Sequence, residues 1–376
     1  MKQSRLEEEA QAELDALQGC NLLRVSRVLD GQPGAVIQLD GRRVLNFSSN
    51  DYLGLAGDGR LAKAGEGAGV GASRLVVGNH REHERLEDWV ADWIRCGAAR
   101  LFNTGYAANV GVLGALLRPG DVVFSDALNH ASIVDGCRLS RAEVVVVPHR
   151  DMTALELELK QRRGRRRIVV SESLFSMDGD LVDVVMLADL CKRYEAALIL
   201  DEAHAIGVRG PEGRGVAAEA GVVPDVLIGT FGKALGSFGA FAATTPAVAQ
   251  LLWNRARTFV FTTALPQSIA ATSQRAIEIV RGTEGDDRRR NLAKNSRSLR
   301  ALVPRLGGVR EGAIAPLVVG DDGDVMQLSD SLFEQGVFVQ GIRPPTVPAG
   351  TARLRVTVSS AHTNEMIERV GRLLVP

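Results

Sequence analysis

The sequence predicts an α/β protein with a mainly parallel, seven-stranded sheet, a smaller C-terminal α+β domain and an N-terminal extension. Two observations predict this fold. From about residue 99 onward, seven short apolar runs alternate with stretches of helix length, as in successive βα units. Most of these runs are uninterrupted, as expected of strands buried on both faces. The C-terminal segment lacks this alternation and combines two strand candidates with two helices.

The predicted elements follow in chain order. Residues 1–18 form an amphipathic helix, and two short strands, Val36–Leu39 and Val44–Phe47, flank a turn at Asp40 and Gly41. Helical spacing of apolar residues then predicts a helix over 84–94. The seven apolar runs are Arg100–Phe102, Val122–Ser125, Glu143–Val147, Ile168–Ser171, Ala197–Leu200, Val226–Ile228 and Ala240–Ala243.

The C-terminal elements are two strands, Ala315–Val319 and Leu354–Val358, and two helices, Val325–Gln335 and Asn364–Leu373. We expect the boundary before them to fall within the long helical region 265–300. The predicted division is therefore residues 1–50 for the N-terminal helix and strands, 51–275 for the large α/β domain and 276–376 for the small domain.

Composition excludes several functional classes. The chain has 45 basic and 45 acidic residues, so its charge gives no reason to expect a nucleic-acid or membrane partner. Its four cysteines show neither paired spacing nor a zinc pattern, and we expect no metal. The N-terminus lacks the apolar core of a signal peptide, and no run of 18 uncharged apolar residues is present. We expect a cytoplasmic protein.

Chemically useful residues follow the predicted strands. Because ligands of open α/β sheets bind at the carboxyl ends of the strands, these segments are expected to form one site. They are a small turn at 103–109, the segment 126–132 with His130, the segment 172–180, the acidic segment 201–204 with His204, and the glycine-containing segment 229–236 with Lys233.

Several kinds of site fit parts of this set. Asp201, Glu202 and His204 are a plausible metal-ligand group. Gly229 to Lys233 suggests a phosphate loop, but its spacing is too short for that motif. Pyridoxal phosphate accounts for the whole set, because it requires a lysine amine, a carboxylate facing its pyridine nitrogen, an anion-binding turn and a flat group against its ring. We expect the glycines on either side of Lys233 to allow it to approach the cofactor closely.

The residues named above resemble the α-oxoamine synthase family of fold-type-I pyridoxal-phosphate enzymes, and the resemblance covers nearly the whole chain. Its motifs lie at 46–55, 71–74, 105–106, 129–132, 176–179, 201–204, 230–233 and 341–355. The last of these most resembles the acyltransferase of biotin synthesis, which joins L-alanine to a pimeloyl thioester, either of CoA or of a carrier protein. A family member that uses glycine, and a cofactor-binding protein without catalysis, remain as alternatives.

The resemblance implies a role for each matching residue. The cofactor would be bonded to Lys233, paired through its pyridine nitrogen with Asp201, hydrogen-bonded through its phenolic oxygen to His204, and stacked against His130. Phosphate would be held by Thr230 and by the backbone of Gly105 and Tyr106, with Ser176 lining the site. A homodimer is implied, in which Thr262 and Thr263 complete the neighbouring subunit's phosphate site. The implied substrate residues are Arg355 for the amino-acid carboxylate, Arg24 and Thr346 for the acyl group, Arg343 nearby, and Asn50.

The chain departs from the family at two places. Tyr106 stands where phenylalanine is common in the biotin-pathway members, and the segment from Ala56 to Gly69 is several residues short. The first should not matter if only the backbone of residue 106 binds phosphate. The second leaves open whether a helix forms before the Gly71–Arg74 motif.

Overall fold

A computed structural model describes residues 4–375, and their contacts divide the chain into two compact units. The large unit comprises residues 50–176 and 180–292. The small unit comprises the described residues up to 49, residues 177–179 and those from 293 onward. The predicted division at 50 and 275 stays a prediction; the helix α12 (Thr283–Leu302) runs through residue 292, where the large unit ends.

The large unit is built on a seven-stranded sheet in which only β10 runs antiparallel to its neighbours, so the predicted mainly parallel sheet is confirmed. In spatial order the strands are β4 (Ala98–Phe102), β10 (Ala240–Thr244), β9 (Val226–Thr230), β8 (Ala197–Asp201), β7 (Arg167–Glu172), β5 (Val122–Asp126) and β6 (Glu143–Val147). The central strands are buried except for one partly buried end residue in each of β5, β7 and β8, whereas the edge strand β6 exposes Val144 and Val146. An edge strand has only one paired neighbour, which explains this difference from the prediction of continuous burial.

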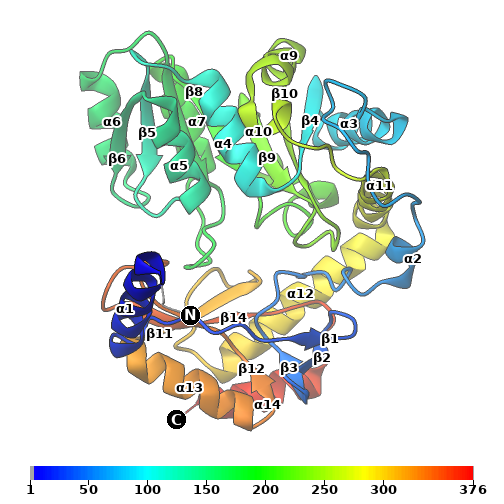
Figure 1. Cartoon of the computed structure of the whole chain (residues 1–376), viewed down its shortest axis with the longest axis vertical. Helices are drawn as coiled ribbons and strands as arrows, with labels where there is room; N and C mark the ends of the chain where they lie inside the picture. The colour runs from blue at the N-terminus through cyan, green and yellow to red at the C-terminus, as the bar shows by residue number, and fades with distance from the viewer. Residues whose placement is uncertain (1–3, 376) are drawn as a thin grey trace. The chain divides into compact units, whose positions relative to one another are not determined.

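The helices of the large unit pack on its sheet or lie beside it (Figure 1). They are α2 (Gly59–Ala62), α3 (Arg81–Ile94), α4 (Gly105–Leu116), α5 (Ala131–Ser140), α6 (Met152–Gln161), α7 (Val184–Arg193), a 3₁₀ turn (Pro211–Gly213), α8 (Val216–Ala220), α9 (Pro246–Arg255), α10 (Arg257–Val260) and α11 (Gln267–Arg281). The buried side of α4 packs with α5, α9 and α10 on the middle of the sheet, through Val112, Ile133, Leu252 and Phe259. The short segment after Ala56 forms a single helical turn, α2.

The small unit contains two sheets. One joins β1 (Leu29–Asp30), β2 (Val36–Leu39), β3 (Arg42–Asn46) and β12 (Val337–Phe338), and the other joins β11 (Ile314–Gly320), β14 (Ala352–Thr357) and β13 (Gly341–Ile342). The helices α13 (Asp322–Glu334) and α14 (Asn364–Leu374) confirm the two predicted C-terminal helices. Phe333 of α13 packs on Ile37, Leu39 and Val44.

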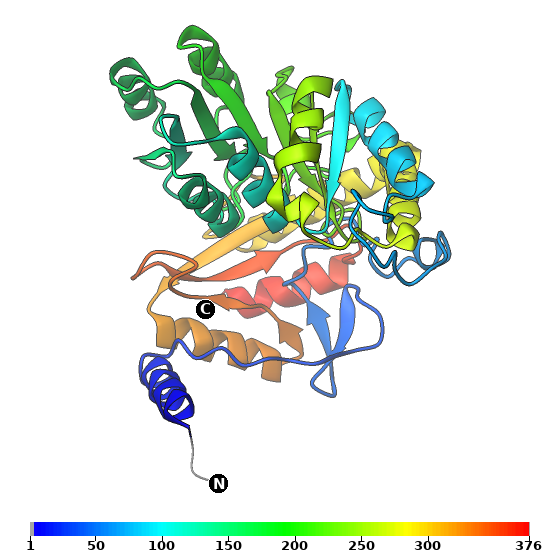
Figure 2. The same cartoon turned by 45° about the horizontal axis from the view of Figure 1, so that its top comes forward.

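The predicted N-terminal helix is α1 (Arg5–Gly19), and the first three residues of the prediction lie outside the described part of the chain. None of the residues of α1 is buried, and Figure 2 shows the helix standing apart from the strands of its unit. Among residues 4–375, no helix combines the length and apolar character that crossing a membrane requires.

Candidate active site

A chain of hydrogen bonds leads to Lys233 in the large unit. Its amine nitrogen Nζ lies 2.7 Å from Nε2 of His204. The other ring nitrogen of His204, Nδ1, lies 2.7 Å from the hydroxyl of Tyr52, which donates to Oδ1 of Asn50 at 3.0 Å. Lys233 follows β9 and His204 follows β8. Because these two strands are parallel, their carboxyl ends lie at the same edge of the sheet, and the segments that follow them lie close together.

Asp201 lies at the end of β8, and 5% of it is exposed. Its Oδ2 accepts from Nδ2 of Asn109 at 2.7 Å, and its Oδ1 accepts from the backbone N–H of Ala203 at 2.8 Å. The same amide nitrogen of Asn109 donates to the hydroxyl of Ser132 at 2.9 Å. These bonds orient a buried carboxylate that can face a cationic nitrogen.

His130 is the N-cap residue of α5 and keeps an exposed face. Its Nδ1 accepts from the backbone N–H of Ser132 at 3.2 Å and lies 2.7 Å from the hydroxyl of Ser132. Partial burial, together with the nearby charge of Lys233, lowers the pKa of His130, although the charge of Asp201 opposes this. A neutral ring with its proton on Nε2 follows, which suits stacking on a flat ligand.

Two further carboxyl groups are buried near Asp201. Glu172 ends β7 and is the direct strand partner of Asp201 on β8. Burial, and then the charge of Asp201, raise the pKa of Glu172 well above its ordinary value. Burial also raises the pKa of Glu202 to about 7.

Glu202 supports the protein backbone. Its carboxyl oxygens accept hydrogen bonds from the backbone of Val216 and Ala217 and from the hydroxyl of Ser173, at 2.7–2.9 Å. Within residues 4–375, no group of three His, Cys, Asp or Glu side chains has the arrangement of a metal site. The metal interpretation required Glu202 to share an ion with its neighbours, and these bonds direct its oxygens elsewhere.

The N-terminus of α4 provides an anion-binding turn. The side chain of Thr104 caps the N–H of Ala107. Among the described residues, none accepts a hydrogen bond from the N–H groups of Gly105 and Tyr106. A Cβ atom added to Gly105 would meet no atom within 4 Å, so there is open space beside these donors. This arrangement fits a phosphate group.

Four other predicted cofactor residues make hydrogen bonds within the large unit. The backbone N–H of Ser176 donates to Glu172 at 3.2 Å. The hydroxyl of Thr230 donates to the carbonyl of Gly239 at 2.9 Å. The predicted pair Thr262 and Thr263 contacts the side chain of Asn103, at 3.3 and 2.9 Å, just before the turn at the start of α4.

The predicted substrate arginines lie in the small unit. Arg24 donates to the hydroxyl of Thr346 at 3.4 Å, and Arg343 donates to the backbone carbonyls of Asn21 and Leu23. These arginines and Thr346 line a pocket of about 510 Å³. Arg355 lies elsewhere, on β14, and 6% of it is exposed. The structure thus brings Arg24, Arg343 and Thr346 together and leaves Arg355 outside that pocket.

Sequence reasoning missed several residues of this site. Tyr52, Asn109, Ser132 and Glu172 all contact a predicted site residue directly. Tyr52 and Asn109 lay inside matched or expected segments, but nothing local marked their side chains. The sequence analysis explained the glycines beside Lys233 by close approach of the cofactor, and Gly236 has a different reason. Its φ is +64°, and an added Cβ would lie 2.4 Å from the backbone nitrogen of Ala56. Contact with the segment before α2, rather than access to a ligand, requires this glycine.

Comparisons with known proteins show the family to which the chain belongs. A family model for class I and II aminotransferases matches residues 42–373. The chain is 45% identical over 373 residues to an 8-amino-7-oxononanoate synthase from Citrifermentans bemidjiense, covering 96% of each protein. Its structure is similar to that of a serine palmitoyltransferase variant from S. paucimobilis with a bound aldimine of pyridoxal phosphate and myriocin, at 28% identity and a TM-score of 0.92 over 99% of this chain and 98% of the other. It is also similar to an 8-amino-7-oxononanoate synthase from Francisella tularensis, at 27% identity and a TM-score of 0.73, over 88% and 96%.

Proposed function

The chain belongs to the class I and II aminotransferase family, among its α-oxoamine synthases, and we propose that it condenses L-alanine with a pimeloyl thioester. The products are 8-amino-7-oxononanoate and carbon dioxide, in a step of biotin synthesis. The observation that carries this proposal is the 2.7 Å contact between Lys233 and His204 beside the buried carboxylate of Asp201, in a chain 45% identical to a synthase of that name.

The site residues fit pyridoxal 5'-phosphate as the cofactor. Lys233 supplies the amine for covalent attachment, and Asp201 supplies a buried, oriented carboxylate for the pyridine nitrogen. The open N–H groups of Gly105 and Tyr106 suit its phosphate, and we assign Thr230 and Ser176 to the cofactor as well. When bound, this cofactor withdraws electron density from the α-carbon of the amino acid.

The other steps belong to the residues of the chain. With the cofactor bound, the amine of Lys233 would take and return the proton of the α-carbon. His204 would hydrogen-bond the phenolic oxygen of the cofactor, and the neutral ring of His130 would lie against its flat ring. The charge of Asp201 would favour a protonated pyridine nitrogen.

Arginines account for substrate binding. Arginine recognises carboxylates and phosphates through paired hydrogen bonds. We assign Arg24, Arg343 and Thr346 to the acyl thioester, because they line one pocket. Arg355 is assigned to the carboxylate of alanine, and Asn50 to the substrate side of the site.

A homodimer is the proposed assembly, with Thr262 and Thr263 completing the partner's phosphate site. A Lys233→Ala chain mixed with a Thr262→Ala/Thr263→Ala chain should then regain activity, because each hybrid dimer contains one intact site. Small-molecule substrates are the expected partners, without nucleic acid or membrane, and the expected location is the cytoplasm.

The test is a panel of thioesters against alanine, glycine and serine, with release of free thiol as the measurement. Pimeloyl-CoA and a pimeloyl-carrier protein should be turned over with alanine. Palmitoyl-CoA with serine tests the reaction that the name of the structural relative, serine palmitoyltransferase, describes. Acetyl-CoA with glycine tests another reaction of the family. Turnover confined to either of the latter pairs would replace the proposed substrates but keep the family. Cofactor binding without turnover of any pair would favour a non-catalytic protein.

A further inference from the structure

Helix α3 carries a buried carboxylate, Glu87, that accepts hydrogen bonds from two arginines and a strand. Its Oε1 accepts from Nη1 of Arg74 at 3.0 Å and from the backbone N–H of Leu101 at 3.1 Å. Its Oε2 accepts from Nη1 of Arg100 at 2.9 Å. We propose that Glu87 is a positioning residue for the phosphate of the cofactor, because it holds the end of β4 that leads into the anion-binding turn at Gly105. The inference rests on the cofactor of the proposed function.

The bond to Leu101 takes the place of a neighbouring strand. β4 lies at one edge of the seven-stranded sheet and pairs only with β10. A backbone N–H on the open edge of a strand needs another acceptor, and for Leu101 this acceptor is the carboxylate of Glu87. β4 ends at Phe102, and the donors Gly105 and Tyr106 follow within four residues. Because so short a turn joins them to the strand, a displaced strand end displaces these donors as well.

The two arginines need the negative charge of Glu87. The side chains of Arg74, Glu87 and Arg100 are 4%, 8% and 19% exposed, so solvent compensates little of their charge. Nη2 of Arg74 is buried without a hydrogen-bond partner within residues 4–375. A buried cation is costly unless an anion or hydrogen bonds compensate it. The bonds to Glu87 therefore hold both arginines in place.

Arg74 connects Glu87 to the anion-binding turn by a second route. The Cζ atom of Arg74 lies 5.6 Å from the ring centre of Phe259 on α10. The residue before this ring, Thr258, donates through its hydroxyl to the carbonyl of Ala107 at 2.5 Å. Ala107 lies in the first turn of α4. Glu87 thus supports the turn from β4 and, through Arg74, from α10.

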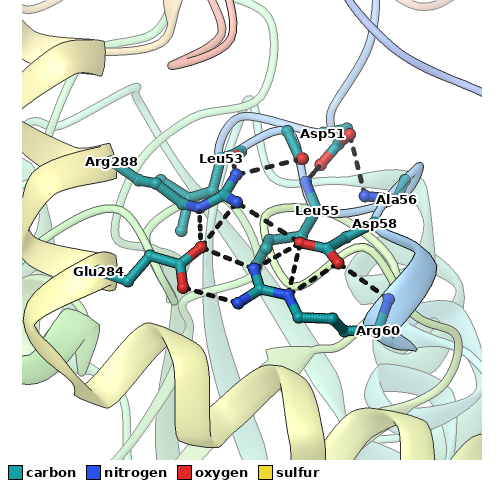
Figure 3. A network of polar contacts seen from close by, with 9 residues as sticks. Asp51, Leu53, Leu55, Ala56, Asp58, Arg60, Glu284 and Arg288 are labelled. Carbon is teal, nitrogen blue, oxygen red and sulfur yellow. Dashed lines mark hydrogen bonds and ion pairs between the residues drawn. The ribbon is translucent and has the colours of Figure 1, made fainter. Parts of the chain in front are cut away.

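A second charged network of the large unit provides a contrast (Figure 3). There, Nη1 of Arg288 on α12 donates to the carbonyl of Leu53 at 2.6 Å, and Glu284 accepts from Arg288 and Arg60 at 2.8 and 2.7 Å. The side chains of Arg60 and Glu284 are 45% and 41% exposed, so water can replace a lost partner. Glu87 is too deeply buried for this, and its loss must instead be taken up by movement of the segments that it holds.

A substitution of Glu87 can act through charge or through position, and the two effects have opposite signs. Loss of the negative charge would leave an uncompensated positive charge, which favours the binding of an anion. Displacement of the turn would instead weaken the hydrogen bonds from Gly105 and Tyr106 to a phosphate. Glu87→Asp separates the two effects, because aspartate keeps the charge but is one methylene group shorter and cannot reach the three donors together.

The experiment compares the binding of pyridoxal phosphate and of pyridoxal, which lacks the phosphate, to the full chain after removal of its cofactor. Both aldehydes can bond to the amine of Lys233, and visible absorbance follows their binding. The ratio of the two dissociation constants therefore measures what the phosphate contributes. Glu87→Asp should bind pyridoxal phosphate roughly tenfold more weakly than wild type, as for one lost hydrogen bond to a charged group, and should bind pyridoxal equally well.

Two controls separate positioning from general stability. Asp121 is also a buried carboxylate, which accepts from Arg165 at 2.7 Å and from the backbone N–H of Arg166 at 3.0 Å. It precedes β5 and so lies at the opposite edge of the sheet from the anion-binding turn. Asp121→Asn should lower the stability of the protein but leave the ratio of dissociation constants unchanged. Arg60→Gln, in the exposed network, should also leave this ratio unchanged.

A second variant keeps the test decisive where Glu87→Asp does not fold by circular dichroism. Arg100→Lys keeps the charge at a partly exposed side chain but alters the bond to Glu87, and should weaken pyridoxal phosphate binding about threefold. An unchanged ratio in the folded variant, or equal weakening of both aldehydes, overturns the inference. Wild-type protein that binds neither aldehyde would overturn the proposed function, and this inference with it.

Discussion

His149 should make the stability of the large unit depend on pH. Its Nδ1 lies 2.9 Å from Asp126 and its Nε2 lies 3.1 Å from Asp180, which also accepts from Arg150 at 2.8 Å. Burial alone would lower the pKa of His149, but the hydrogen bonds to the two carboxylates outweigh it and raise this pKa to about 9, from 6.5. Asp180 lies four residues after Ser176, so the ion pair between His149 and Asp180 lies close in sequence to a predicted cofactor residue.

The size and sign of the effect follow from linkage. At about 1.4 kcal/mol for each pKa unit, the rise corresponds to roughly 3 kcal/mol of folding free energy. Because the folded protein holds this proton more tightly than the unfolded chain, the contribution is complete below pH 6.5. It falls as the pH rises from 6.5 and is lost above about 9. The side chains of His149 and Asp180 are each 24% exposed, so solvent screening should reduce the measured value to about 2 kcal/mol.

Denaturant unfolding of wild type and His149→Gln at pH 6 and pH 10 provides the test, followed by tryptophan fluorescence. The variant should be less stable by about 2 kcal/mol at pH 6, and the difference should nearly vanish at pH 10. Arg150→Gln is the control, since arginine stays charged over this range and its effect should be the same at both pH values. An equal loss for His149→Gln at both values, or a His149 that titrates near 6.5 by NMR, would show that the bridge does not bind the proton tightly.

Four further predictions concern the site and its packing. Lys233→Ala should abolish turnover while circular dichroism remains that of a folded protein, because no other amine replaces it. Asp201→Asn should raise the barrier by several kcal/mol, on the order of other preorganised charges, measured as kcat/KM. Arg24→Ala should raise KM for the pimeloyl thioester and spare alanine, whereas Arg355→Ala should weaken alanine binding, each by roughly 1.5–3 kcal/mol. Gly236→Ala should lower the free energy of unfolding by about 1–3 kcal/mol through its left-handed φ, or more through its contact with Ala56, whereas Gly232→Ala should be tolerated better in denaturant unfolding.

The sheet of the large unit could be predicted because burial on both faces leaves a direct mark in the sequence. All seven apolar runs form strands, and the residues that follow six of them lie at one edge of the sheet, because only β10 runs the other way. The two-residue strands β1, β12 and β13 left no such mark. β12 pairs with β3, and a partner nearly 300 residues away is chosen by tertiary packing rather than by local pattern.

The sequence predicted the site residues for which the resemblance implies a role. It did not predict the residues that contact them. The resemblance implies roles for His204 and Lys233, whereas Tyr52 lies in a matched motif without an implied role, and only folding brings its hydroxyl to His204, 152 residues away. Gly236 illustrates the same limit. The sequence suggested a reason for the glycine, but only the structure shows which backbone approaches it.

Glu172 and Asp201 lie at the carboxyl ends of the adjacent strands β7 and β8, and the structure distinguishes their environments where the sequence could not. Glu172 and Asp201 are direct partners on adjacent strands, and two buried carboxylates so close cannot both ionise without a large penalty. Asp201 accepts from both Asn109 and Ala203, whereas Glu172 accepts only from Ser176 in the bonds described, and its Oε1 is buried without a partner among residues 4–375. Hydrogen bonds favour the charged form of the acid that receives more of them. Burial and the charge of Asp201 raise the pKa of Glu172, so Glu172 is the acid of this pair whose protonated form the structure favours.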